Sequence, residues 1–208
     1  MFLLLLKTMN CVLMHMSSLF SDENWHPEGA TEVDFRQLEG TACYCDPEAE
    51  ALLQEAVAKL PLNALHWIDS GDYHYLSALW LRRLERPARL FLFDNHPDDQ
   101  PGAFDSGLLS CGGWVAEVRR GNPLVRDDAS DAYISIDLDY LSPEYARTDW
   151  DQGKASLPDL LDKLDAIRST YGIAGVDICG GITLAQGGRA EDFAVNRATR
   201  QALQDYFG

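Results

Sequence analysis

A chain of 208 residues is long enough to bury a full hydrophobic core, and at this length we expect one domain spanning residues 1–208. Its 46% hydrophobic and 24% charged residues are typical of a soluble globular protein. The formal net charge of −16, without any basic stripe, argues against a nucleic-acid partner. Such a charge can attract cationic substrates such as guanidinium compounds, or it can serve solubility alone.

The cysteines and the first residues bear on the cellular compartment. The five cysteines are an odd number and form no Cys-x-x-Cys pair, so we expect reduced thiols in a cytoplasmic protein. The apolar stretch at residues 2–6 has no basic segment before it and is too short to span a bilayer. We therefore expect no signal peptide and no membrane partner, while a homo-oligomer stays open.

The first half of the chain predicts short strands and two helices. Residues 2–6 and 11–16 are expected to be strands, 17–34 a loop and 36–46 irregular. A helix begins at Pro47, with Asp46 as its cap, and carries one apolar face as far as Leu60. The elements expected next are a strand at 64–68, a helix at 75–84 and a strand at 90–93.

The second half continues the alternation of helices and strands. A glycine-rich connection at 102–113 leads to a short helix at 114–119 and a strand at 133–136. A helix at 157–170, a strand at 173–178 and a closing helix at 190–207 follow. Alternating strands and helices with short links predict an α/β fold with a doubly wound, mainly parallel sheet flanked by helices.

Acidic and imidazole side chains follow two of the predicted strands. Asp94, His96 and Asp98 occupy alternate positions directly after the strand at 90–93. Such oxygen and nitrogen donors suit a hard or borderline divalent ion such as Mn²⁺, although a solvated acidic loop has the same composition.

The second acidic pair, Asp137 and Asp139, comes at the end of the strand at 133–136. We expect both side chains on one side of the chain, because strand side chains repeat every two residues. Two adjacent like charges are unfavourable unless a cation bridges them. Because ligands bind at the carboxyl ends of parallel strands, the two stretches together predict a centre for two metal ions.

These motifs carry a resemblance to a known family. Asp94-x-His96-x-Asp98 followed by Ser135-x-Asp137-x-Asp139 resembles the paired metal motifs of the ureohydrolases, which include arginases, agmatinases and formiminoglutamases. The segment at residues 70–74, Ser-Gly-Asp-Tyr-His, resembles the family's Gly-Gly-Asp-His segment with an offset of one residue. The residues of these motifs most resemble those of a small divergent branch of the family that contains peptide arginases. The resemblance covers roughly residues 64 to 180.

The resemblance implies an arginase-like sheet in a shortened form and a site with two divalent ions, Mn²⁺ in the family. By position, Asp94 and Asp137 form the catalytic centre and bridge the ions. The remaining implied metal ligands are His74 and Asp98 on one ion, and His96 and Asp139 on the other. The implied reaction is hydrolysis of a guanidino group, with arginine in a peptide converted to ornithine and urea.

The sequence also departs from the family at positions that contact substrate or move protons. Gly180 stands where arginase has a glutamate that holds the guanidinium, and no histidine lies between Pro97 and Asp137. Gln100 stands where arginase has an asparagine that helps to recognise the substrate. Asp177 is either an acid behind the ligands or a buried capping group.

Some other carboxylate must hold a guanidinium cation, and the loops near the site offer Asp149, Asp151 and Glu191. We expect Glu191, because the loop at 180–188 can fold over the site. Two alternatives to the arginase-like reaction remain open. One is a metal-dependent amidohydrolase, such as a deacetylase, acting on another C–N bond. The other is a non-catalytic protein that binds a metal or a ligand.

Overall fold

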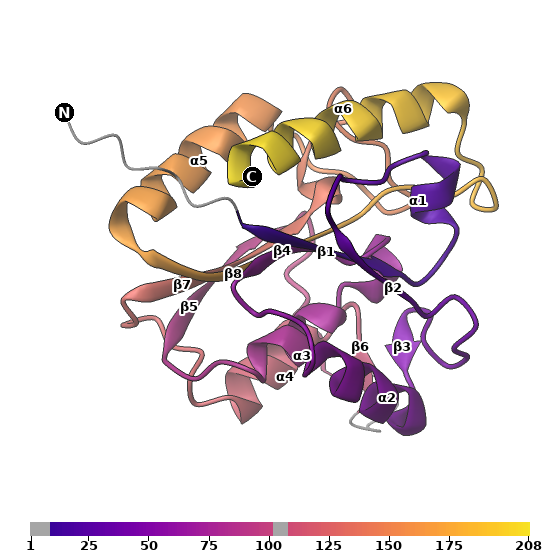
Figure 1. Cartoon of the computed structure of the whole chain (residues 1–208). Helices are drawn as coiled ribbons and strands as arrows, with labels where there is room; N and C mark the ends of the chain where they lie inside the picture. The colour runs from indigo at the N-terminus through magenta and orange to yellow at the C-terminus, as the bar shows by residue number, and fades with distance from the viewer. Residues whose placement is uncertain (1–8, 102–107) are drawn as a thin grey trace.

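The structure is a computed structural model that describes residues 9–101 and 108–208. Its centre is a parallel sheet of six strands in the order β2-β1-β4-β8-β7-β5 (Figure 1). The strands are β1 (Asn10–His15), β2 (Thr31–Asp34), β4 (Ala64–Trp67), β5 (Ala88–Phe93), β7 (Asp131–Asp137) and β8 (Gly172–Cys179). A small antiparallel pair, β3 (Tyr44–Cys45) with β6 (Leu109–Ser110), lies beside it.

Helices cover both faces of the sheet, as the doubly wound prediction requires (Figure 1). One face carries α1 (Leu19–Asp22), α5 (Leu157–Thr170) and α6 (Ala190–Phe207). The other face carries α2 (Pro47–Val57), α3 (Leu76–Leu81) and α4 (Trp114–Gly121). The predicted α/β fold with a parallel sheet flanked by helices is therefore confirmed.

The core divides into two clusters because side chains alternate across each strand. In β1, Val12 and Met14 pack with the cluster under α2, α3 and α4, while Leu13 packs with the cluster under α5 and α6. Strands buried on both faces read as nearly continuous apolar runs, and this is why the central strands could be recognised in the sequence.

Several predicted elements are confirmed at or near their expected bounds. The helices at 157–170 and 190–207 are α5 and α6, and the predicted helix at 114–119 is α4, which continues to Gly121. No helix in the described part of the chain is long and apolar enough to cross a membrane.

Other expectations were wrong in detail. Residues 17–34, expected to be a loop, contain α1 and β2, and the segment 36–46 contains β3. The helix expected at 75–84 is the shorter α3, and α2 ends at Val57 rather than Leu60. Asp46 precedes α2, but its side chain makes no capping hydrogen bond. The strand predicted at 2–6 and part of the connection at 102–113 lie outside the described residues.

Candidate metal centre

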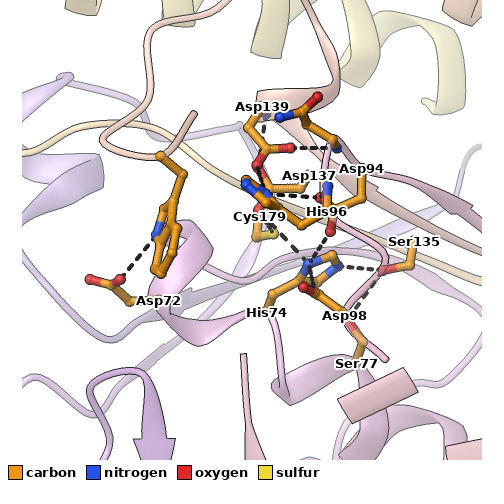
Figure 2. Close-up of polar contacts among 12 residues, drawn as sticks. Asp72, His74, Ser77, Asp94, His96, Asp98, Ser135, Asp137, Asp139 and Cys179 are labelled. Atoms are coloured by element: carbon orange, nitrogen blue, oxygen red, sulfur yellow. Dashed lines mark hydrogen bonds and ion pairs between the residues drawn. The ribbon is translucent and has the colours of Figure 1, made fainter. Parts of the chain in front are cut away.

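The predicted metal ligands converge at the carboxyl ends of β4, β5 and β7 (Figure 2). His74 follows the single 3₁₀ turn Gly71–Tyr73 after β4, and Asp94 follows Phe93 at the end of β5. Asp137 is the last residue of β7. Since Phe93 pairs with Ile136, and Asp137 pairs with Cys179, the parallel register brings the ends of β5, β7 and β8 to one level.

Asp139 reaches the site by a different route from the one expected. It does not lie on the strand with Asp137 but in the 3₁₀ turn Leu138–Tyr140, and its N–H donates to Asp137 Oδ1 at 2.9 Å. The strand ends at Asp137, because this carboxylate caps the turn that follows. Asp139 is nevertheless buried, and its Oδ1 accepts from the backbone N–H of Asn95 at 3.0 Å.

The candidate ligands form two groups that share Asp94. His74, Asp94 and Asp98 form one group, and Asp94, His96 and Asp139 form the other. Asp94 faces both histidines, with Oδ2 lying 3.0 Å from His74 Nδ1 and Oδ1 lying 3.6 Å from His96 Nδ1. The two carboxylate oxygens of Asp94 are therefore divided between the two groups.

Asp98 and Asp139 complete the two groups from opposite sides. Asp98 Oδ2 lies 3.0 Å from His74 Nδ1, and Asp139 Oδ2 lies 2.7 Å from His96 Nδ1. Asp137 belongs to a third group with His74 and Cys179, and its Oδ2 lies 3.8 Å from His74 Nδ1. Asp98 and Asp139 thus lie in separate ligand groups, as the resemblance implies. Of the two carboxylates expected to be shared between the groups, Asp94 and Asp137, only Asp94 belongs to both.

The electrostatics of the site favour a bound cation. Desolvation, with the neighbouring Asp94 carboxylate, raises the pKa of Asp137 to about 6. Desolvation, together with Asp137 and Asp94, raises the pKa of Asp139 to about 9. Carboxylates held this close are compensated best by divalent cations, and a set of oxygen and imidazole donors suits Mn²⁺ or a similar ion. The residues present fit the two metal ions that the sequence predicted.

A hydrogen-bonded chain behind His74 fixes the orientation of its ring (Figure 2). His74 Nε2 lies 2.9 Å from Ser135 Oγ, and Ser135 Oγ donates to Asp177 Oδ1 at 2.6 Å. Ser77 Oγ also donates to Asp177 Oδ1, at 3.0 Å. Because the Ser135 hydroxyl proton goes to Asp177, its lone pair accepts from His74 Nε2–H, and Nδ1 is left to face the carboxylates. Asp177 therefore supports a ligand rather than capping an element.

Two further contacts to the ligands were not anticipated from the sequence. Trp114 Nε1 donates to Asp98 Oδ2 at 2.7 Å, and Cys179 Sγ donates to Asp137 Oδ2 at 3.0 Å. Burial raises the pKa of the Cys179 thiol, which keeps it protonated. The only sequence signal for Cys179 was its place at the end of a predicted strand, like Asp137.

The candidate ligands line a pocket of about 60 Å³ that opens to solvent. Gln100 lines this pocket, as expected, beside Cys111 and Gly112. Glu191 does not line it. Its side chain is 78% exposed near the start of α6, and its nearest charged partner is Arg189 at 3.9 Å. The expectation that Glu191 reaches the site has no support in the geometry, because α6 begins outside the pocket.

Three loops meet at Asp72, directly beside Gly71 and Trp150 of the pocket wall, and this region, with Asp149 and Gln186, is called the mouth. Trp150 lines the pocket and donates from Nε1 to Asp72 Oδ1 at 3.1 Å. Gln186 donates from Nε2 to Asp149 Oδ2 at 2.5 Å and to Asp72 Oδ2 at 3.4 Å. Desolvation, followed by the nearby Asp72 carboxylate, raises the pKa of Asp149 to about 6. Neither Trp150 nor Gln186 was singled out from the sequence, because only the carboxylates of these loops were considered as groups that could bind a cation.

Gly180 is enclosed at the base of the site. Its φ is +97°, and a Cβ at this position would lie 2.5 Å from Asp137 Oδ1 and 2.8 Å from the backbone nitrogen of Leu138. A side chain here would displace Asp137, so the position that resembles the arginase glutamate admits only glycine in this fold.

No family model matches the chain. An uncharacterised protein of Thermotoga maritima is 28% identical to it over 197 residues, covering 81% of this chain and 78% of that protein.

Several solved structures share its architecture over nearly its whole length. Proclavaminate amidino hydrolase from Streptomyces clavuligerus has a TM-score of 0.65 and 13% identity, and the match covers 97% of this chain and 92% of that one. Arginase from Medicago truncatula has a TM-score of 0.65 and 15% identity, with 96% and 87% covered. A hypothetical agmatinase from Burkholderia thailandensis has a TM-score of 0.63 and 16% identity, with 97% and 86% covered. The chain therefore has the fold of the arginases and agmatinases, the ureohydrolase fold.

Proposed function

We propose that the protein is a hydrolase of the ureohydrolase type that acts on a C–N bond with two divalent metal ions, Mn²⁺ being the expected metal. The observation that carries this proposal is the shared carboxylate of Asp94. One oxygen faces His74 in the group with Asp98, and the other faces His96 in the group with Asp139. A carboxylate placed between two ligand groups is the arrangement that a two-metal site needs.

The chain's own residues would prepare the site for this chemistry. His74 and Asp98 would hold one ion and His96 and Asp139 the other, with Asp94 and, as its motif position implies, Asp137 shared between them. When bound, two such ions lower the pKa of a water molecule and stabilise negative charge that develops on the substrate. Ser135 and Asp177 keep His74 Nδ1 directed at the carboxylates, and Trp114 holds Asp98 in place.

For the substrate we propose the guanidino group of an arginine residue in a peptide, with ornithine and urea as products. The acidic pocket and the net charge of −16 favour a cationic group. Three of the four exposed large hydrophobic side chains of the described residues, Tyr44, Trp150 and Leu184, lie on segments that contact Asp72 at the mouth. Of these three, Trp150 lines the acidic pocket itself, and its exposed indole offers apolar contact to a peptide chain.

The test combines metal analysis with product analysis. Protein produced with added manganese should contain two ions per chain, and it should release urea from an arginine-containing peptide faster than from free arginine. Acetate release from an acetyl-lysine peptide, without urea, would favour the amidohydrolase alternative. Two bound ions with no turnover of either peptide would favour the alternative of a non-catalytic metal-binding protein.

A matched pair of variants tests the site itself. Asp137→Asn keeps an oxygen acceptor for the N–H of Asp139 but removes one negative charge from the ligands. We expect it to lose metal and urea release while remaining folded. Asp127→Asn removes the same charge from a side chain that is 98% exposed, and it should keep both. Unchanged metal content in the Asp137 variant would overturn the proposed site.

A further inference from the structure

Any cationic substrate of this site must be recognised without the glutamate that the arginases use. Gly180 cannot carry a side chain, because its Cβ would lie 2.5 Å from Asp137 Oδ1. Glu191 is exposed and does not line the pocket. The group that recognises a cation must therefore be found among the other residues of the pocket wall and mouth.

Besides the two histidines, Trp150 contributes an aromatic side chain to the lining of this pocket. It is 40% exposed, although it stands beside the candidate ligands. Its ring centroid lies 5.9 Å from that of His96, with the rings nearly perpendicular at 71°. A Cβ on Gly71 would lie 3.0 Å from both Trp150 Cδ1 and Asp137 Oδ2, so the indole packs closely against residue 71 and beside the candidate ligands. A substrate group bound beside the carboxylates therefore lies within reach of the indole.

Asp72 holds the indole in this position. It accepts from Trp150 Nε1 at 3.1 Å, and it also accepts from Cys43 Sγ at 3.3 Å and from Gln186 Nε2 at 3.4 Å. The carboxylate thus lies at the edge of the indole, where it adds negative charge without covering the face of the ring. Gln186 places a second carboxylate, that of Asp149, at the same mouth.

We propose that Trp150, oriented by Asp72, is the specificity-determining residue that receives the cationic side chain of the substrate. The face of the indole binds the planar guanidinium, and the carboxylates at the mouth add electrostatic attraction. This inference rests on the proposed function, because it supplies the cation recognition that a guanidino hydrolase requires. It assigns that role to the loop after β7, whereas the arginase glutamate follows a later strand.

Binding to the manganese-loaded protein separates cation recognition from turnover. Two peptides, Ala-Ala-X-Ala-Ala with ornithine or norvaline at X, have the same side-chain carbons and differ by one ammonium group. Calorimetry gives the ratio of their dissociation constants, and neither peptide carries a group that can be hydrolysed to urea. The wild-type protein should bind the ornithine peptide at least about tenfold more tightly, a difference within the range of cation–π and charge attraction together.

Two substitutions of Trp150 distinguish the role of its face from its size. Trp150→Leu removes the π-face, and it should reduce the preference for ornithine by roughly two- to thirtyfold, the range expected for a cation on an aromatic ring. Trp150→Phe keeps a weaker π-face and loses the donor to Asp72, so its preference should fall between those of the wild-type protein and Trp150→Leu. A merely structural role for Trp150 would weaken the binding of both peptides equally and leave the ratio unchanged.

The outcomes separate this inference from the proposed function. A full preference for ornithine in Trp150→Leu would overturn the inference, whatever the urea assay shows. Equal binding of the two peptides by the wild-type protein would also overturn it. If the wild-type protein still releases urea from an arginine peptide in either case, the proposed function stands. A preference that falls in Trp150→Leu and falls less in Trp150→Phe supports the inference.

Discussion

Two glycines provide a matched test of how tightly the base of the site is packed. Gly180 and Gly187 have nearly the same backbone conformation, with φ of +97° and +100°. Their surroundings differ. A Cβ at residue 180 meets Asp137 Oδ1 at 2.5 Å, whereas a Cβ at residue 187 meets nothing within 4 Å. Substitution of each glycine by alanine therefore imposes the same backbone strain but very different contacts.

The expected magnitudes follow from this difference. An alanine with φ near +100° costs about 1–3 kcal/mol of folding free energy, and both variants carry this cost. Gly180→Ala adds overpacking of about 1–3 kcal/mol against Asp137 and Leu138. We expect its free energy of unfolding to fall by about 2–6 kcal/mol in total, roughly twice the loss in Gly187→Ala. Because the added methyl group displaces Asp137, only Gly180→Ala should also lose metal.

Urea denaturation of both variants, together with metal analysis of the folded proteins, measures these effects. Equal destabilisation of the two variants, with metal content unchanged in both, would refute the close contact between residue 180 and Asp137. The same outcome would remove the physical reason given for the missing glutamate, since a larger side chain could then be accommodated there.

Three further predictions concern the ligands and the core. Asp94→Asn should lose both metal ions because both ligand groups share this carboxylate, whereas Asp98→Asn should retain one ion; equal stoichiometry in the two variants would contradict the division. Ser135→Ala removes the hydrogen-bond acceptor of His74 Nε2 and should weaken metal binding by about 10- to 100-fold, measured by competition with a chelator. An unchanged affinity would show that Ser135 does not orient the His74 ring. Burial lowers the pKa of His66 to about 4, from 6.5, so the unfolded chain binds more protons between these values. As pH falls from 7 to 4, the free energy of unfolding of the wild-type protein should therefore fall by about 3 kcal/mol more than that of His66→Phe. An equal fall in the two proteins, measured by denaturation at both pH values, would contradict this.

The sequence predicted the elements whose burial leaves a periodic pattern. The helix α5 could be located because Leu160, Leu164 and Ile167 repeat on one face and are buried. The strand β2 was missed because its residues, Thr31–Asp34, are mostly exposed and polar, and its pairing with β1 depends on backbone hydrogen bonds. Backbone pairing of an edge strand leaves no hydrophobic signal in the sequence.

The candidate ligands could be brought together from the sequence because each lies at or after the end of a recognisable strand. The mouth could not be predicted in this way. Trp150 and Asp72 lie 78 positions apart, and their hydrogen bond depends on how the loops after β4 and β7 are placed in three dimensions. Glu191 was expected at the site because the loop at 180–188 could fold over it, but the sequence does not determine where α6 begins relative to the pocket. Asp177 was recognised as an acid near the site, but its link to His74 through Ser135 required the register of β7 with β8.

The position of β5 in the sheet gives metal binding a mechanical consequence. This strand ends the strand order and pairs with β7 within the sheet, yet the segment that follows it supplies Asp94, His96 and Asp98. Their partners, His74 and Asp137, belong to segments after β4 and in β7, nearer the interior of the sheet. Bound ions would therefore link the edge strand β5 to β7 and to the segment after β4. A metal concentration 100 times the dissociation constant would add about 2.7 kcal/mol against global unfolding and slow amide hydrogen exchange, most visibly along β5, which has a paired strand on one side only.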